Sequence, residues 1–298
     1  MKLVRFHLPG QGAHLGQLAG DRVYDLSASD APALASLAAL LRASTETPIP
    51  DLLDQVEIED LPSHAYAELD RGPVPGAAHL LPPVDCQEVW AAGVTYAWSR
   101  EARVREAVSK EIYVKVYEAE RPELFFKALP EKVVGPNDWI GIRGDSQWNV
   151  PEPELALVIN PALQIVGYTV GNDVSSRDIE GENPLYLPQA KVYRHSCALG
   201  PAIVVEDGTF DVTALSIRMG IERDDVVVYS GDASTAQIHR RLDDLAAYLG
   251  RYEDFPHGAV LLTGTGIVPD DTFSLQNGDE VAIEIEHVGT LRNHVRRM

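Results

Sequence analysis

Alternating apolar and polar positions recur along most of the chain, in short runs separated by glycine, proline and aspartate. This two-residue period is typical of β-strands, whose side chains point in turn to opposite faces of a sheet. Residues 1–28 follow the pattern around four glycines and predict short strands joined by turns. Further strands are expected at 89–94, 155–159, 165–170, 202–205, 212–221, 226–230, 260–262 and 281–287.

A few segments have the apolar spacing of helices instead. The first spans 29–44, where leucines recur on one face. A second, rich in charge, is expected from 99 to 117 and must end before Pro122. A third begins with Ser234 or Thr235 as its N-cap and ends before a glycine. On its apolar face lie Ile238, Leu242, Leu245 and Leu249. Because these helices do not alternate with the strands, the sequence predicts an α+β, mostly β fold.

Prolines and acidic residues are dense between residues 45 and 85 and suggest a connector between two units. We place the boundary near residue 80. Residues 1–80 are then expected to form a small N-terminal domain and its connector, and residues 81–298 a larger β domain that carries the chemistry.

The chain carries 25 basic and 45 acidic residues, a net charge of −20. This charge disfavours nucleic acids and anionic membranes as partners. The N-terminus does not resemble a signal peptide, and a cytoplasmic location is expected. Two distant cysteines, Cys86 and Cys197, suggest buried thiols and no disulfide framework. The negative electrostatic potential of such a chain would repel an anionic substrate. A divalent cation beside Lys and Arg would make the potential positive at the binding site.

Acidic side chains gather at one end of a predicted hairpin. Glu152 and Glu154 flank Pro153 at the start of an apolar run, and they share one face of the strand. If the hairpin turns near residue 162, Asp173 lies beside both glutamates. Three converging carboxylates repel one another unless protons or a cation neutralise them, and Mg²⁺, Mn²⁺ or Ca²⁺ suits such oxygen ligands. The alternative is that an acidic chain produces this spacing by chance.

Several segments occur in an order that resembles the fumarylacetoacetate hydrolase family. They are Glu152-Pro153-Glu154, the run 167–178 (Gly-Tyr-Thr-Val-Gly-Asn-Asp-Val-Ser-Ser-Arg-Asp), Pro188-Gln189-Ala190-Lys191 and Leu262-Thr263-Gly264-Thr265-Gly266. The resemblance spans roughly residues 88–290. It implies a mixed β-roll preceded by a small N-terminal domain, assembled as a homodimer or homotetramer.

The same resemblance implies roles for individual residues. Glu152, Glu154 and Asp173 would hold Mg²⁺, with Mn²⁺ or Ca²⁺ as alternatives. Lys191 and Glu123 would be acid–base residues above the metal. The substrate would be a small 2-keto acid, and the residues implied to contact it are Arg177, Gln189, Gly264 and Thr265.

One position departs from the C–C hydrolases of the family, which carry a histidine where this chain has Ser99. Serine cannot activate water at neutral pH without help, so the departure favours a lyase. The segments 121–128, 145–154 and 182–189 resemble the family's dehydratases of 2-keto-3-deoxy sugar acids. An acylpyruvate-type hydrolase or a keto-acid decarboxylase on the same scaffold stays open. A non-catalytic metal-binding protein would leave Lys191 and Glu123 without a purpose.

Overall fold

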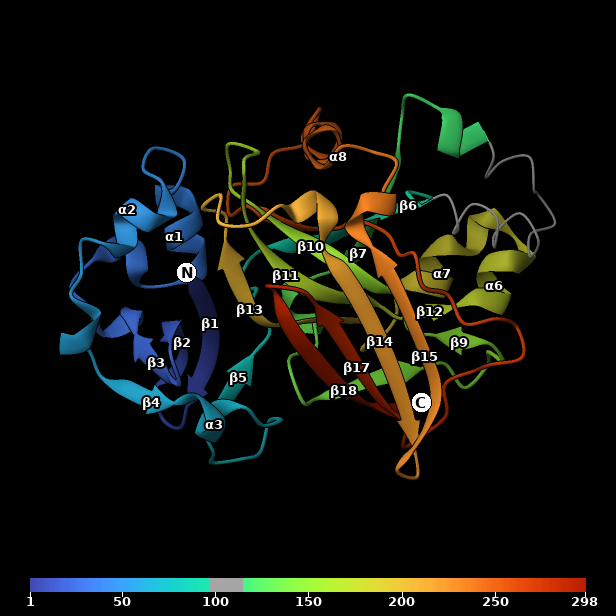
Figure 1. Cartoon of the computed structure of the whole chain (residues 1–298), viewed down its shortest axis with the longest axis horizontal. Coiled ribbons are helices and arrows are strands. Elements are labelled where there is room, and N and C mark those ends of the chain that lie inside the picture. The colour runs from blue at the N-terminus through green and yellow to red at the C-terminus, as the bar shows by residue number, and fades with distance from the viewer. Residues whose placement is uncertain (97–114) are drawn as a thin grey trace.

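A computed structural model describes residues 1–96 and 115–298, and most of its ordered elements are strands (Figure 1). The predicted mostly β fold is confirmed. A large mixed sheet has the strand order β4-β3-β2-β1-β13-β11-β10-β16-β6-β7, with β5 paired to β1. Its strands are β1 (Lys2–Leu8), β2 (Gly12–Ala19), β3 (Arg22–Asp25), β4 (Ser63–Ala65), β5 (His79–Leu81), β6 (Glu88–Gly93), β7 (Glu123–Ala128), β10 (Pro153–Ile159), β11 (Ile165–Asp173), β13 (Cys197–Val205) and β16 (Ala259–Leu262).

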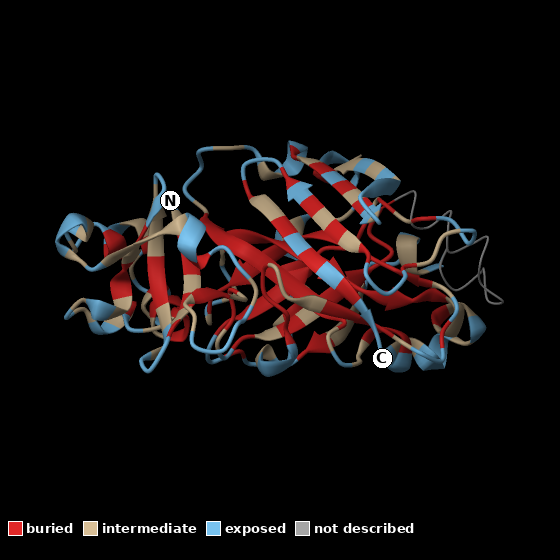
Figure 2. Cartoon of the chain, turned by 90° about the horizontal axis from the view of Figure 1, so that it is seen from below, coloured by how far each residue is buried: buried red, intermediate tan, exposed pale blue. Residues whose placement is uncertain are grey.

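A second sheet packs against the first and encloses the main apolar core. Its order is β15-β14-β17-β18-β8. The core joins buried side chains of both sheets, such as Leu157 of the large sheet and Met219, Ile283 and Leu291 of the second. Burial is concentrated between the sheets (Figure 2). The second sheet comprises β8 (Trp139–Ile142), β14 (Ser216–Arg223), β15 (Val226–Ser234), β17 (Glu280–Ile285) and β18 (Gly289–Arg297).

The N-terminal strands continue the large sheet, because β1 pairs with β13. The helices α1 (Leu37–Ala43) and α2 (Ile49–Leu53) lie beside these strands, in the blue part of Figure 1. Leucines of α1 pack on Val158 and Ile203 of the central strands. The boundary near residue 80 stays a prediction. No helix in the described ranges is long and apolar enough to cross a membrane.

Two predicted helices are shorter than expected. The segment 29–44 forms a 3₁₀ turn at Pro32–Leu34 and becomes α-helical only at α1, where the Ser36 hydroxyl accepts a hydrogen bond from the Ala39 N–H and caps the helix. The third predicted helix is broken. Ser234 caps a single 3₁₀ turn (Thr235–Gln237), Ile238 is extended and bridges to Tyr96, and α8 (Leu242–Leu249) begins after it. Pairing with a residue far away in the sequence therefore overrides the local helical spacing.

Other expectations have mixed outcomes. The run 212–221 begins with a 3₁₀ turn, Val212–Ala214, before β14 starts at Ser216. Ser99 lies outside the described residues, and so does most of the predicted helix at 99–117. Both cysteines are free; Cys197 is buried, as predicted, but Cys86 is exposed, so its predicted burial is wrong.

Candidate metal and active site

The hairpin of β10 and β11 brings three carboxylates to one end of the large sheet. Glu154 faces Gly171 in the antiparallel register, and the Asp173 N–H donates to the Glu152 carbonyl oxygen at 3.0 Å. The predicted hairpin alignment is thus confirmed. Pro153 begins β10, the position at which a strand tolerates a residue without an N–H. Ligand oxygens of Glu152, Glu154 and Asp173 lie within 4.8 Å of one another, and all three residues are buried.

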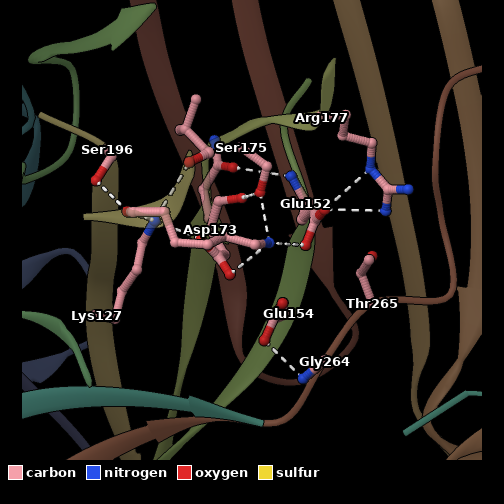
Figure 3. A network of polar contacts seen from close by, with 12 residues as sticks. Lys127, Glu152, Glu154, Asp173, Ser175, Arg177, Ser196, Gly264 and Thr265 are labelled. Atoms are coloured by element: carbon pink, nitrogen blue, oxygen red, sulfur yellow. Dashed lines mark hydrogen bonds and ion pairs between the residues drawn. The ribbon is translucent and has the colours of Figure 1, made fainter. Parts of the chain in front are cut away.

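Cationic side chains contact two of these carboxylates (Figure 3). Arg177 donates to Glu152 Oε1 from Nη2 at 3.0 Å. Lys191 Nζ lies 2.7 Å from Glu152 Oε2 and 3.0 Å from Asp173 Oδ2, while Lys127 pairs with Asp173 Oδ1. Every oxygen of Glu152 and Asp173 therefore has a cationic neighbour, which lowers the cost of burying these charges.

Glu154 has a different environment. Its Oε2 accepts a hydrogen bond from the Gly264 N–H at 2.6 Å. Burial, followed by the charges of Asp173 and Glu152, raises the pKa of Glu154 well above its usual value, and Lys191 and the Gly264 N–H oppose this only in part. A divalent cation among the three carboxylates would relieve the same repulsion. The all-oxygen set fits a hard cation such as Mg²⁺.

Lys191 ends the short helix α7 (Leu187–Lys191) and is fully buried. Its Nζ also donates to Ser175 Oγ at 2.6 Å. The Ser196 hydroxyl donates to the Lys191 carbonyl oxygen at 2.8 Å. The predicted meeting of Lys191 with the acidic cluster is confirmed, and its ammonium group is held directly against two candidate metal ligands.

Lys127 also contacts the acidic cluster and is not among the site residues predicted from the sequence. Besides its contact with Asp173, its Nζ donates to the carbonyl oxygens of Val174 and Lys191, at 3.2 and 2.5 Å. Its side chain has no solvent exposure. The available signal was a lysine within the apolar strand β7, where burial of a charge requires partners.

Glu123 begins β7 directly opposite Gly93 at the end of β6. Its carboxyl group folds back over this glycine. A Cβ atom at position 93 would lie 2.6 Å from Glu123 Cδ and closer still to its Oε2. Gly93 thus leaves the space that the carboxyl group occupies.

A cavity of about 360 Å³ opens beside Glu123. Glu180, on the helix α6 (Arg177–Glu182), is a second acidic residue of its lining. The other lining residues are Val116, Ala119, Arg121, Pro122, Pro184 and Leu187. The described lining is therefore largely apolar, with two acidic residues and one arginine.

The residues implied to contact substrate are not equally placed. Arg177 and Gly264 bind the acidic cluster directly, through Glu152 and Glu154. Thr265 is buried on the same loop as Gly264 (Figure 3), and its hydroxyl oxygen accepts from the Ile267 N–H. Gln189 is exposed on α7, where its carbonyl oxygen accepts from Arg143. Their contacts with a substrate stay predictions.

Comparison with known proteins gives one consistent picture. The family model "Fumarylacetoacetate (FAA) hydrolase C-terminal" matches residues 88–296. A protein of Haloferax volcanii named probable 2-keto-3-deoxyxylonate dehydratase is 47% identical over 277 residues, 91% of each chain. The 2-dehydro-3-deoxy-D-arabinonate dehydratase of Saccharolobus solfataricus is 44% identical over 222 residues, 73% of this chain and 74% of the relative.

The structural comparison agrees. A solved structure described as 2-keto-3-deoxy-D-arabinonate dehydratase complexed with magnesium and 2,5-dioxopentanoate is 33% identical to this chain. It covers 100% of this chain and 99% of its own, with a TM-score of 0.83.

Proposed function

The chain belongs to the fumarylacetoacetate hydrolase family, and on that premise we propose that it is a magnesium-dependent dehydratase of a 2-keto-3-deoxy sugar acid. The reaction would convert 2-dehydro-3-deoxy-D-arabinonate to 2-oxoglutarate semialdehyde (2,5-dioxopentanoate) and water. One observation carries the proposal: Lys191 lies against a buried triad of carboxylates that fits Mg²⁺. The relatives named as dehydratases of such acids support the choice of substrate.

The proposed chemistry is a β-elimination followed by a proton shift. Bound Mg²⁺ would polarise the carbonyl group of the 2-keto acid and make its C3 proton more acidic. Lys191 and Glu123 are the groups proposed to move protons, one taking the C3 proton and one protonating the departing C4 hydroxyl. Transfer of a proton from C5 to C3 would then give an enol with its double bond between C4 and C5. Loss of the C5 hydroxyl proton and protonation at C4 would give the aldehyde. The five carbons are retained and one water is released.

Neighbouring residues would hold Lys191 and the candidate metal ligand Glu152 in place. Lys127 donates to the carbonyl oxygen of Lys191, and Ser175 accepts a hydrogen bond from the Lys191 ammonium group. Arg177 holds one oxygen of Glu152, so the carboxylate keeps one orientation. Such preorganisation is what proton transfer in a fixed geometry requires.

The test of the function is an NMR assay of 2-keto-3-deoxypentonate with Mg²⁺. We expect a five-carbon semialdehyde as product, and about 10²-fold or greater loss of kcat in Glu123→Gln with substrate affinity retained, because the amide can no longer exchange a proton. Glu131→Gln, at an exposed position, is the matched control. Cleavage of acylpyruvates to pyruvate and a carboxylic acid, at rates well above any dehydration, would establish the hydrolase alternative.

Gly93→Ala should lower kcat by about 10²-fold, because the added methyl group displaces the Glu123 carboxyl group. The effect acts through Glu123, so adding Gly93→Ala to Glu123→Gln should cost little more. Steady-state kinetics of the single and double variants measure this, with the melting temperature as a check on folding. Fully additive losses would contradict the assigned role of Gly93.

We also propose a homodimer or homotetramer in the cytoplasm. β15 is the edge strand of the second sheet, and its exposed side chains include Val226, Val227 and Val228. Exposed apolar edge strands favour pairing with another chain. The exposed free thiol of Cys86 agrees with a reducing compartment. Light scattering coupled to size-exclusion chromatography measures the assembly, and a monomer at micromolar concentration would contradict it.

A further inference from the structure

The cavity beside Glu123 lies between the start of β7 and the helix α6. Its two acidic lining residues are Glu123 and Glu180, and Glu180 is only 4% exposed. The proposed chemistry uses Glu123 but assigns nothing to Glu180. Among the residues that the structure describes, the remaining walls are mainly apolar, so a polar group that enters the cavity finds few partners there besides Glu123, Glu180 and Arg121.

Helix α6 connects this cavity to the acidic cluster. Arg177 and Glu180 are three residues apart on the helix, so their side chains lie on one face, one turn apart. Arg177 binds the candidate metal ligand Glu152, while Glu180 lines the cavity. One helix therefore carries both the contact with the cluster and a wall of the cavity, and the two residues are about 4.5 Å apart along its axis.

We propose that this cavity is the subsite for the hydroxylated tail of the substrate, and that Glu180 is a specificity-determining residue that accepts a hydrogen bond from the C5 hydroxyl group. The proposal rests on the proposed function. If C1 and C2 lie at the acidic cluster and the C4 hydroxyl group at Glu123, only C5 and its hydroxyl group extend further. Glu180 is the lining residue left to accept a hydrogen bond from this hydroxyl group.

The charge of the cavity also selects against other 2-keto acids. A dicarboxylic acid would place its second carboxylate beside Glu123 and Glu180, and repulsion between like charges is stronger beside a buried side chain such as Glu180 than in water. Arg121 lines the cavity too, but its side chain is exposed and its charge is screened by solvent. A hydroxyl group donates to a carboxylate without this penalty.

Three five-carbon ligands that differ only at C5 test the proposal: 2-oxopentanoate, 5-hydroxy-2-oxopentanoate and 2-oxoglutarate. All lack a C4 hydroxyl group and cannot be dehydrated, so their dissociation constants can be measured by calorimetry with Mg²⁺ present. In the wild type we expect the hydroxyl ligand to bind about tenfold more tightly than 2-oxopentanoate, and 2-oxoglutarate the most weakly. Glu180→Ala should abolish the hydroxyl preference, and Glu180→Gln should reduce the penalty for 2-oxoglutarate.

The matched control is Glu182→Gln, which removes the same charge from an exposed position on the same helix and should leave the order unchanged. Unchanged affinity for 2-oxopentanoate shows that a variant keeps an intact site. If both Glu180 variants retain the wild-type order, Glu180 is not the determinant and the proposal fails. That result is distinct from failure of the function itself, which the wild-type enzyme would reveal by not dehydrating 2-keto-3-deoxypentonate.

Discussion

Replacement of Lys191 by methionine should lower kcat by about 10²–10⁴-fold, the usual cost of losing one proton-transfer group. Methionine keeps much of the buried stem but has no proton to give or accept. The Lys191 Nζ contacts with Glu152, Asp173 and Ser175 all disappear in this variant. Steady-state turnover at saturating Mg²⁺ is the measurement.

Two further measurements separate catalysis from structure in this variant. Loss of a buried cation leaves Glu152 and Asp173 less well neutralised, so the melting temperature is compared with that of the wild type. Lys132→Met, at an exposed position, is the control and should keep normal turnover. A folded Lys191→Met protein with near-normal kcat would assign Lys191 to structure alone.

Removal of divalent metal should abolish activity, and Mg²⁺ or Mn²⁺ should restore it. The physical basis is the triad of buried oxygen ligands, Glu152, Glu154 and Asp173. The cation should also raise the melting temperature, because it binds only the folded state. EDTA treatment, dialysis and a titration with each metal measure both effects.

Glu154→Gln separates the metal from its neighbours. Glu154 accepts the Gly264 N–H, and the amide oxygen of glutamine can keep that bond. The variant should fold but bind Mn²⁺ at least about tenfold more weakly, because a neutral oxygen replaces a charged ligand. Electron paramagnetic resonance measures the concentration of free Mn²⁺, from which the affinity of each protein for the metal follows. Full activity in metal-stripped wild-type protein would remove the metal from the mechanism.

The central hairpin was predictable from the sequence because its determinants are local. The spacing of Glu152 and Glu154 in an apolar run defines one face of a strand, and the turn near residue 162 sets which residues oppose them. This alignment places Asp173 beside both glutamates. The position of Lys191 came from the family resemblance, since its spacing along the chain carries no geometric information.

Only the tertiary structure decided which charges and spaces surround this hairpin. Lys127 reaches the carbonyl oxygen of Lys191 across a separation of 64 residues, and Glu123 occupies space that Gly93 leaves free on a neighbouring strand. Ile238 leaves a helical pattern to pair with Tyr96. Sequence periodicity reports which side of its own element a residue faces. The partner on that side depends on how sheets and helices pack, which residues far apart in the chain determine together.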